Sequence, residues 1–270
     1  GTLSGTKAMK QAIEADWNGV DIESATLEPE LQEAISKWGY VKHDLPQKEN
    51  FNIVIPMAGR GQRWIDAGYT FPKPLVEIKN KPMIQLVLEN LKIEGKYTFI
   101  CLKEHIEKYS LDVLLKNIKP DCNIVSIDKV TEGAAVSFLE AGKFIDNDNP
   151  LIIANCDQLL DWAPSDFISF INKKDPDGAI ITYTSSHPKN SFVKINEDGK
   201  ITEVAEKKPI SNHANAGLFY YKSGKDFVNA INEMIQKNIR TNDEFFIAPA
   251  YNELISKGKE IMPYKVQNVK

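Results

Sequence analysis

The chain has 270 residues and a formal net charge of −4, with 42% hydrophobic and 26% charged residues. This balance is ordinary for a soluble globular protein, and the negative charge argues against a general nucleic-acid binder, which is usually basic. No apolar run approaches the roughly 20 residues that a membrane-spanning helix needs, so we expect no membrane insertion.

Three cysteines, Cys101, Cys122 and Cys156, fall in or beside apolar runs at scattered spacing. Such a set predicts neither a disulfide framework nor a metal cluster, and indicates reduced thiols in a cytoplasmic protein. No signal peptide is recognised at the start of the chain. Because the first residue is Gly1 and not methionine, we expect either a fragment of a longer protein or a short remnant of cloning.

Residues 1–48 differ in composition from the rest of the chain. Two helices are predicted there, in TKAMKQAIEADWNG and in PELQEAISKWGY, where Leu31, Ile35 and Trp38 stand at helical spacing. We interpret this part as a helical extension that caps the main domain, predicted at 51–270. A docking arm and the remnant of a lost upstream domain are the alternatives.

Strand and helix signals alternate from residue 51 onward. Apolar runs predict strands at 52–57, 97–102, 123–127, 150–155 and 178–184, with helices near 82–91, 104–118, 132–143 and 164–174. Continuous apolar strands separated by amphipathic helices indicate a mostly parallel sheet with helices on both faces. The predicted fold class is therefore α/β, a three-layer Rossmann-like domain.

The second half of the chain changes character at residue 191. Residues 191–206 alternate in hydrophobicity around Asp198-Gly199, which predicts a hairpin. A strand at 215–221 follows, with Phe219 and Tyr221 on one face and Tyr220 on the other. Helices at 223–238 and 243–257 and a strand at 260–267 complete the prediction.

The turn after the first strand, IPMAGRGQRW at 55–64, combines two glycines with two arginines. A glycine-rich turn between a strand and a helix lets backbone N–H groups approach a phosphate. The dinucleotide fingerprint fails because Trp64 occupies its third glycine position, and the P-loop pattern is absent. The segment FPKPLVEIKNKPMI follows from Phe71, with Lys73 between two prolines.

Gly59-x-Gly61-x-Arg63 followed by Pro-Lys-Pro-Leu resembles the opening pattern of the sugar-phosphate nucleotidyltransferase superfamily, the nucleotide-sugar pyrophosphorylases. The resemblance covers about 51–267, and TEGAAVSFLEA, ANCDQ, EVAEKKP and NAGLFYY stand in the expected order. It extends to small bacterial enzymes of capsule and surface-polysaccharide loci. It implies the nucleotide-diphospho-sugar transferase fold, with an NTP and a phosphorylated acceptor giving an NDP-activated precursor and pyrophosphate.

That reaction brings two polyanions together, so cations and a metal matter more than a general base. Arg63 can bind phosphate oxygens bidentately and Lys73 supplies a point charge, and both are predicted to be catalytic. The predicted nucleotide-binding residues are Ala58, Gly59, Gly61 and Arg63 at the phosphates and Thr131, Glu132, Gly133 and Ala134 at the base. Glu132 could instead begin and cap the following helix. The identity of the base stays open.

Asp157 follows the apolar run LIIAN and is expected at the carboxyl end of a strand, where open α/β sheets bind ligands. The resemblance implies that it is catalytic and binds Mg²⁺. The alternatives are an Asp in a turn or helix cap, with Asp161 as a competitor. Many pyrophosphorylases carry a second metal-binding Asp after the strand equivalent to 215–221, where Lys222 stands here. Asp243, Glu244, or substrate oxygens and water could complete the coordination.

Glu206 and Lys207 resemble the family pair in which the carboxylate contacts a sugar hydroxyl and the lysine contacts the acceptor phosphate. Asn215 and Glu244 complete the predicted acceptor-binding residues. A solvated charge run is the alternative for the first pair, and NDEFF at 242–246 could cap a helix or reach the acceptor. The acceptor could be a hexose 1-phosphate or a non-sugar phosphate such as phosphocholine.

Two other functions stay open at this stage. A glycosyltransferase that uses a nucleotide sugar can share the fold but usually carries Asp-x-Asp, whereas Asn155-Cys156-Asp157 stands here. A catalytically silent NTP-binding subunit is the other alternative, against which Arg63, Lys73 and Asp157 argue. Formation of a homo-oligomer is also left open.

Overall fold

The computed structural model describes residues 50–59, 61, 68 and 71–269. The predicted helical extension at 1–48 lies outside the described residues, as do Arg60 and Arg63. None of the described helices is long and apolar enough to cross a membrane.

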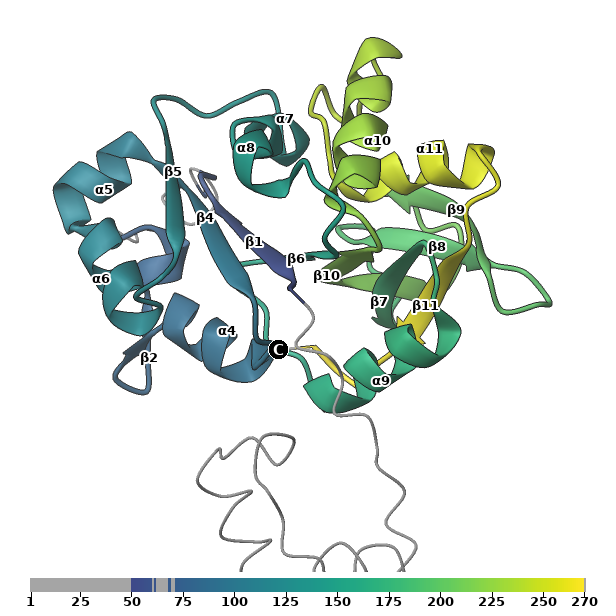
Figure 1. The fold of residues 1–270 in the computed structure, drawn as a ribbon, viewed down its shortest axis with the longest axis horizontal. Coiled ribbons are helices and arrows are strands. Elements are labelled where there is room, and N and C mark those ends of the chain that lie inside the picture. Colours follow the sequence, from purple (N-terminus) through teal and green to yellow (C-terminus); the bar gives the residue numbers. More distant parts are fainter. Residues whose placement is uncertain (1–49, 60, 62–67, 69–70, 270) are drawn as a thin grey trace, which may run out of the picture. The chain divides into compact units, whose positions relative to one another are not determined.

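Helices and strands alternate through the described chain, as Figure 1 shows. The strands are β1 (Asn52–Met57), β2 (Glu77–Ile78), β3 (Lys81–Pro82), β4 (Lys96–Leu102), β5 (Asn123–Ile127), β6 (Leu151–Ala154), β7 (Gly178–Thr184), β8 (Ser191–Ile195), β9 (Ile201–Glu206), β10 (His213–Tyr221) and β11 (Ile261–Lys265). The helices are η1 (Lys73–Leu75), α4 (Met83–Leu91), α5 (Lys103–Tyr109), α6 (Leu111–Ile118), α7 (Ala134–Leu139), α8 (Gly142–Ile145), α9 (Pro164–Lys174), α10 (Gly224–Gln236), η2 (Ala248–Ala250) and α11 (Tyr251–Ser256).

The main sheet has the strand order β11-β7-β10-β6-β1-β4-β5, with the β8–β9 hairpin attached to β10. β1 pairs in parallel with both β4 and β6, and β4 and β7 pair in parallel with β5 and β11. β10 runs antiparallel to its neighbours β6 and β7. The prediction of a mostly parallel α/β sheet is therefore confirmed.

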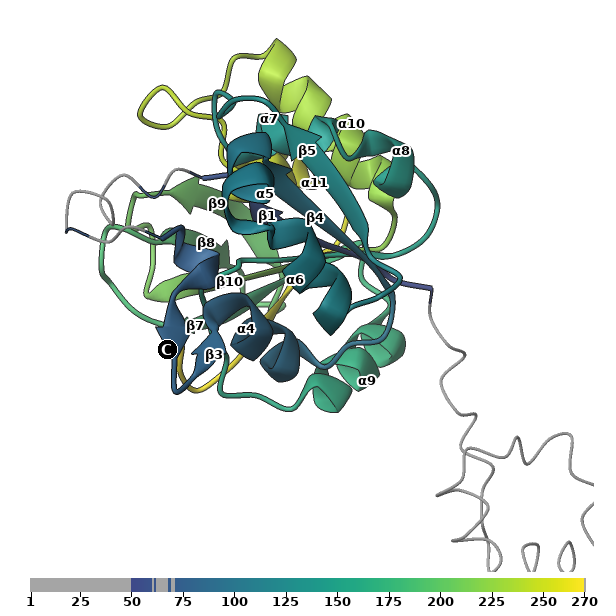
Figure 2. The same ribbon diagram turned by 90° about the vertical axis from the view of Figure 1, so that its left-hand side faces the viewer.

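Two hydrophobic cores lie on opposite faces of this sheet. Helices α7, α8, α10 and α11 cover one face and α4, α6 and α9 cover the other, as the two views in Figures 1 and 2 show. Successive strand side chains alternate between the cores: Val54 enters the first, and Ile53 and Ile55 enter the second. Phe219 and Tyr221 likewise enter one core and Tyr220 the other, as predicted.

Three predicted helices differ from the structure. The segment predicted at 104–118 divides into α5 and α6 at Ser110, whose φ of 50° is left-handed and interrupts the helix. The segment at 132–143 likewise forms two short helices, α7 and α8.

The third difference affects the candidate site, because α11 begins at Tyr251 and not at residue 243. Asn242 and Asp243 have φ angles of 49° and 63°, which Asn and Asp tolerate better than most residues. They form a tight turn closed by the Thr241–Glu244 bridge. NDEFF is therefore a turn followed by an irregular segment, and the prediction that it stands at a helix start is wrong.

Candidate active site

The carboxyl ends of β1, β4, β5 and β6 meet at one edge of the sheet, because these strands are parallel. Ala58 and Gly59 follow β1 there, the 131–134 loop follows β5, and Asp157 follows β6. The antiparallel strand β10 begins at this edge, since Leu218 pairs with Ala154 at the end of β6. Ligands of open α/β sheets bind at such an edge.

Lys73 and Asp157 form an ion pair at this edge, with 2.6 Å between Lys73 Nζ and Asp157 Oδ2. Pro72 and Pro74 flank Lys73, and Pro74 is buried, so the short helix η1 holds this lysine in place. Both charged side chains stay accessible, at 45% and 28% exposure. A partly exposed ion pair contributes little to stability and can exchange its partners for a ligand at small cost.

Asp157 lies in a turn, which was one of the alternatives, but it does not cap α9, whose N-cap is Ala163. The neighbouring Cys156 is half-buried, and desolvation together with the charge of Asp157 raises the pKa of its thiol far above the usual value. This thiol therefore stays protonated and is a poor nucleophile.

A bulge in β10 supports the turn that carries Asp157. Gly217 has a φ of 77°, and its carbonyl oxygen accepts a 2.9 Å hydrogen bond from the Asn155 N–H. A Cβ at Gly217 would lie 1.6 Å from Gln158 Oε1, which itself accepts a 2.7 Å hydrogen bond from Asn155 Nδ2. These contacts are not predicted from the sequence, although a glycine inside an apolar strand is a signal for a bulge.

The segment before α7, predicted to receive the base, is joined to the NDEFF segment. Phe245 N–H donates to the Glu132 carbonyl at 2.8 Å, and Ala135 N–H donates to the Phe245 carbonyl at 3.0 Å. Gly133 lies between these bonds with a φ of 119°, and a Cβ there would lie 2.4 Å from the Phe245 carbonyl oxygen. The hydroxyl of Thr131 closes the loop with a 2.8 Å hydrogen bond to the Gly133 carbonyl.

The Glu132 carboxylate lies 2.5 Å from a guanidinium nitrogen of Arg240. Arg240 also stacks on the Phe245 ring at 3.9 Å and donates to the Asp243 carbonyl. The N-cap of α7 is Gly133, so Glu132 does not cap that helix. Arg240 stands 108 residues away from Glu132, so no local sequence pattern indicates this contact.

The predicted acceptor residues gather around the end of β9. Burial raises the pKa of the Glu206 carboxyl to about 7, while Lys207 and a hydrogen bond from Ser191 lower it and the charge of Glu244 raises it. The Lys207 ammonium lies 4.1 Å from the centroid of the Phe246 ring. Two carboxylates, a lysine and an aromatic ring therefore share one part of the site.

Asn215 does not present its side chain openly to this space. It is 6% exposed, its Oδ1 accepts a 2.7 Å hydrogen bond from the Gly217 N–H, and its Nδ2 donates to Ser191 Oγ at 3.2 Å. These bonds hold the β10 bulge and the start of β8, so Asn215 supports the backbone of the site and its side-chain amide is already occupied.

Lys222 lies at the opposite edge of the sheet from Asp157. Tyr221 pairs with Leu151 and Gly178, the first residues of β6 and β7, and Lys222 Nζ lies 2.7 Å from Asp175. A residue in this position cannot share a metal with Asp157, so the interpretation that Lys222 replaces a second metal ligand is wrong. Within the described part of the chain, no group of three or more His, Cys, Asp or Glu side chains is placed to hold a metal ion.

The glycine loop is described in part. Ala58 is buried at the end of β1, whereas Gly59 is exposed and has open space where a Cβ would stand. Gly61 is half-buried, and Arg63 lies outside the described residues. The described part therefore leaves room for a ligand beside Gly59.

Comparison with known protein families identifies the family of this chain. Residues 52–264 match the family model of the nucleotidyl transferases. This chain belongs to that family. The resemblance to sugar-phosphate nucleotidyltransferases drawn from the motifs is therefore confirmed, whereas a capsule-type role stays a prediction.

The relatives of this nucleotidyl transferase include mannose-1-phosphate guanyltransferases of two fungi. The protein from Yarrowia lipolytica is 27% identical over 173 residues, covering 62% of this chain and 48% of its own length. The protein from Aspergillus oryzae is 28% identical over 175 residues, with the same coverage of 62% and 48%. The chain thus spans about half the length of the curated relatives it matches.

Solved structures share the fold at low identity. A nucleoside-diphosphate-sugar pyrophosphorylase from Vibrio cholerae RC9 superposes with a TM-score of 0.71 at 24% identity, covering 80% of this chain and 93% of its own. The inositol-1-phosphate CTP transferase from T. maritima gives a TM-score of 0.65 at 14% identity, covering 82% and 88%.

Proposed function

We propose that this protein transfers a nucleotidyl group from an NTP to the phosphate of a small phosphorylated acceptor, giving an NDP-activated product and pyrophosphate. The observation that carries this proposal is the accessible ion pair of Lys73 and Asp157, with 2.6 Å between Lys73 Nζ and Asp157 Oδ2. It lies at the edge of the sheet where the glycine loop follows β1. This edge has a cation for phosphates and a carboxylate for a metal on adjacent side chains. Family membership supports the same reaction class.

In this mechanism the acceptor phosphate oxygen attacks the α-phosphorus directly, and the bond to the leaving pyrophosphate breaks. Lys73, together with Arg63, would hold the β- and γ-phosphates and stabilise the charge that develops during transfer. No described residue occupies the space where a Cβ of Gly59 would stand, which supports an approach of the triphosphate to the backbone there. The transfer would be direct, without a covalent enzyme intermediate.

The donor set at Asp157 fits Mg²⁺. This ion keeps several waters and is usually bound through one or two carboxylates plus substrate phosphates, so one accessible aspartate is a sufficient protein contribution. When bound, Mg²⁺ would act as a Lewis acid and template for the phosphates. Asp157 would then leave Lys73, which becomes free for the triphosphate.

For the acceptor we propose a hydroxylated ring phosphate, such as a sugar 1-phosphate. The relatives are named for mannose 1-phosphate, and structural neighbours are named for UDP-glucose and inositol 1-phosphate. Glu206 and Glu244 can accept hydrogen bonds from hydroxyls, and Lys207 can bind the acceptor phosphate. Use of the product for surface polysaccharide and a cytoplasmic location belong to the same proposal.

The test is pyrophosphate release with Mg²⁺, each of ATP, CTP, GTP, UTP and dTTP, and a panel of phosphorylated acceptors that begins with mannose 1-phosphate. We expect release that needs one NTP together with one acceptor. Asp157→Asn and Lys73→Met should lower kcat by about 10²-fold or more, as removal of one electrostatic stabiliser usually does.

Lys222→Met is the matched control. Lys222 has the same 45% exposure as Lys73 and an ion pair of similar length, 2.7 Å, but lies at the opposite edge of the sheet. Its replacement should leave pyrophosphate release unchanged. Hydrolysis of a nucleotide sugar without pyrophosphate release would instead favour a glycosyltransferase, and NTP binding without turnover by any acceptor would favour a silent subunit.

A further inference from the structure

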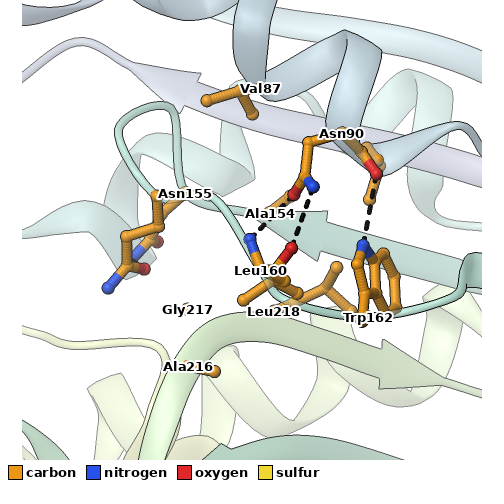
Figure 3. Close-up of a pocket in the computed structure, with 11 residues that line it drawn as sticks. Val87, Asn90, Ala154, Asn155, Leu160, Trp162, Ala216, Gly217 and Leu218 are labelled. Carbon is orange, nitrogen blue, oxygen red and sulfur yellow. Dashed lines mark hydrogen bonds between the residues drawn. The ribbon is translucent and has the colours of Figure 1, made fainter. Parts of the chain in front are cut away.

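Asn90, near the end of α4, binds the backbone of the segment that carries Asp157. Its Oδ1 accepts a 2.8 Å hydrogen bond from the Leu160 N–H, and its Nδ2 donates a 2.9 Å hydrogen bond to the Leu160 carbonyl. The indole N–H of Trp162 donates to the Asn90 carbonyl at 3.2 Å. Figure 3 shows these three bonds beside a small cavity, with Asn155 on its other side.

The strand pairing of β6 ends at Ala154, and the bonds from Asn90 hold the chain beyond that point. Leu160 is 8% exposed, so its peptide groups need partners inside the protein. The Asn90 amide supplies a donor and an acceptor at once and binds Leu160 as a neighbouring strand would. One further link reaches this segment from the C-terminal part of the chain, where the Asp161 N–H donates to the Asn268 carbonyl at 3.0 Å.

Lys73 and Asn90 belong to one stretch of chain that contacts the Asp157 segment twice. Lys73 contacts the Asp157 carboxylate at one end, and Asn90 contacts Leu160 three residues further on. Between them lie η1, the β2–β3 hairpin and α4, and the Met83 N–H donates to the Val76 carbonyl at 2.8 Å. The same short unit, which includes α4, therefore contacts both Asp157 and the segment that follows it.

We propose that Asn90 is a positioning residue that holds the Asp157 carboxylate beside Lys73 at the edge of the sheet where the triphosphate would bind; this inference rests on the proposed function. Asn90 acts through Leu160 and does not touch substrate. Its loss frees the segment after β6, so that Asp157 samples positions away from the phosphates. Misplacement of a reacting group by about 1 Å can cost 10²-fold in rate, and loss of a supporting contact usually weakens metal binding by about 10- to 100-fold.

The experiment compares Asn90→Ala and Asn90→Leu with Asn252→Ala. Asn252 makes the same two-bond contact elsewhere: its Oδ1 accepts from Val204 N–H at 2.9 Å and its Nδ2 donates to the Val204 carbonyl at 2.8 Å. Val204 lies in β9, which is also held by strand pairing with β8. Each alanine substitution therefore removes the same two kinds of hydrogen bond. The two substitutions differ in the segment that loses these bonds, which is the Asp157 segment in one case and the paired strand β9 in the other.

Three quantities are measured for each variant: the melting temperature, the Mg²⁺ concentration that gives half-maximal pyrophosphate release at saturating substrates, and hydrogen exchange of residues 155–162. We expect similar losses of melting temperature in Asn90→Ala and Asn252→Ala. Only the Asn90 variants should raise the half-maximal Mg²⁺ concentration, by about 10-fold or more. Only they should speed exchange of the hydrogen-bonded amides of this segment, including that of Asn155, which lies two residues before Asp157.

An Asn90 variant that loses stability like Asn252→Ala but keeps the wild-type Mg²⁺ dependence would overturn the proposal, because Asn90 would then be structural only. Failure of the proposed function is a separate outcome, in which the wild-type protein releases no pyrophosphate with any pair. In that case hydrogen exchange alone tests the positioning role of Asn90. Faster exchange that reaches the Asn155 amide supports the positioning role, and faster exchange confined to Leu160 rejects it.

Discussion

Glu206 lies at the end of β9, where it is half-buried and has Glu244 nearby. A carboxyl group with a pKa of about 7 changes charge within the working range of most enzymes. Its ionisation should therefore affect both acceptor binding and the stability of the fold.

We expect the effect of Glu206→Gln on stability to depend on pH. The pKa is raised from 4.5 to about 7 in the folded protein, so the proton is bound more tightly in the folded state. The stabilisation is complete below about pH 4.5 and is lost as pH rises through 7. The melting temperature of the variant relative to the wild type should thus be higher by several degrees at pH 8 than at pH 5.

A constant difference between variant and wild type across this range would contradict the raised pKa. Glu203→Gln, on the same strand but exposed, controls for the removal of one negative charge. If Glu206 also contacts the acceptor, the pH profile of kcat/KM for the acceptor should lose an inflection near 7 in Glu206→Gln but not in the control.

Among the elements, the loop before α7 and the segment after the 242–243 turn act as one unit. The Phe245 backbone bonds on both sides of Gly133, and Arg240 adds the ion pair to Glu132. The next residue, Phe246, packs against Lys207 of the acceptor side. A short segment therefore contacts both the proposed base loop and the proposed acceptor residues.

Gly133→Ala should push the loop before α7 away from the Phe245 backbone. The new Cβ would meet the Phe245 backbone at 2.4 Å in a left-handed conformation, so we expect a loss of about 2–4 kcal/mol in the free energy of unfolding. Gly142→Ala, in α8, meets nothing within 4 Å and should stabilise the protein by about 0.5–1 kcal/mol. Chemical denaturation measures both, and equal effects of the two substitutions would refute the close approach at Gly133.

For the molecule as a whole, the sheet separates two cores. Phe138 and Phe167 are both fully buried, one in each core, and each packs on a different ring: Phe227 at 5.3 Å and Tyr264 at 5.2 Å between centroids. The two residues share no ring partner among the described contacts.

Phe138→Leu and Phe167→Leu should each lower the free energy of unfolding by about 1–2 kcal/mol, through lost packing and ring contacts. Their effects should add within about 0.5 kcal/mol in the double variant. The pair Phe138→Leu and Phe227→Leu, whose rings touch, should depart from additivity. Strong coupling between Phe138 and Phe167 in denaturation measurements would mean that the sheet transmits packing changes between its faces.

The sequence by itself determined the parallel α/β order, the two buried faces of the strands and the nucleotidyl transferase motifs, because these depend on local periodicity and on short spacings. It also placed Asp157 at a strand end and Lys73 between two prolines, the two residues that the structure brings together. Their proposed roles, like those of the other site residues, are left to the experiments above.

Only the tertiary structure decided which distant segments meet. The antiparallel direction of β10 places Lys222 at the far edge of the sheet, a reversal that strand periodicity does not reveal. Arg240 on Glu132 and Asn90 on Leu160 join positions 108 and 70 residues apart, and such contacts arise from packing, not from local pattern. Positive φ angles at Asn242 and Asp243 likewise changed a predicted helix start into the turn that brings Phe245 against the loop before α7.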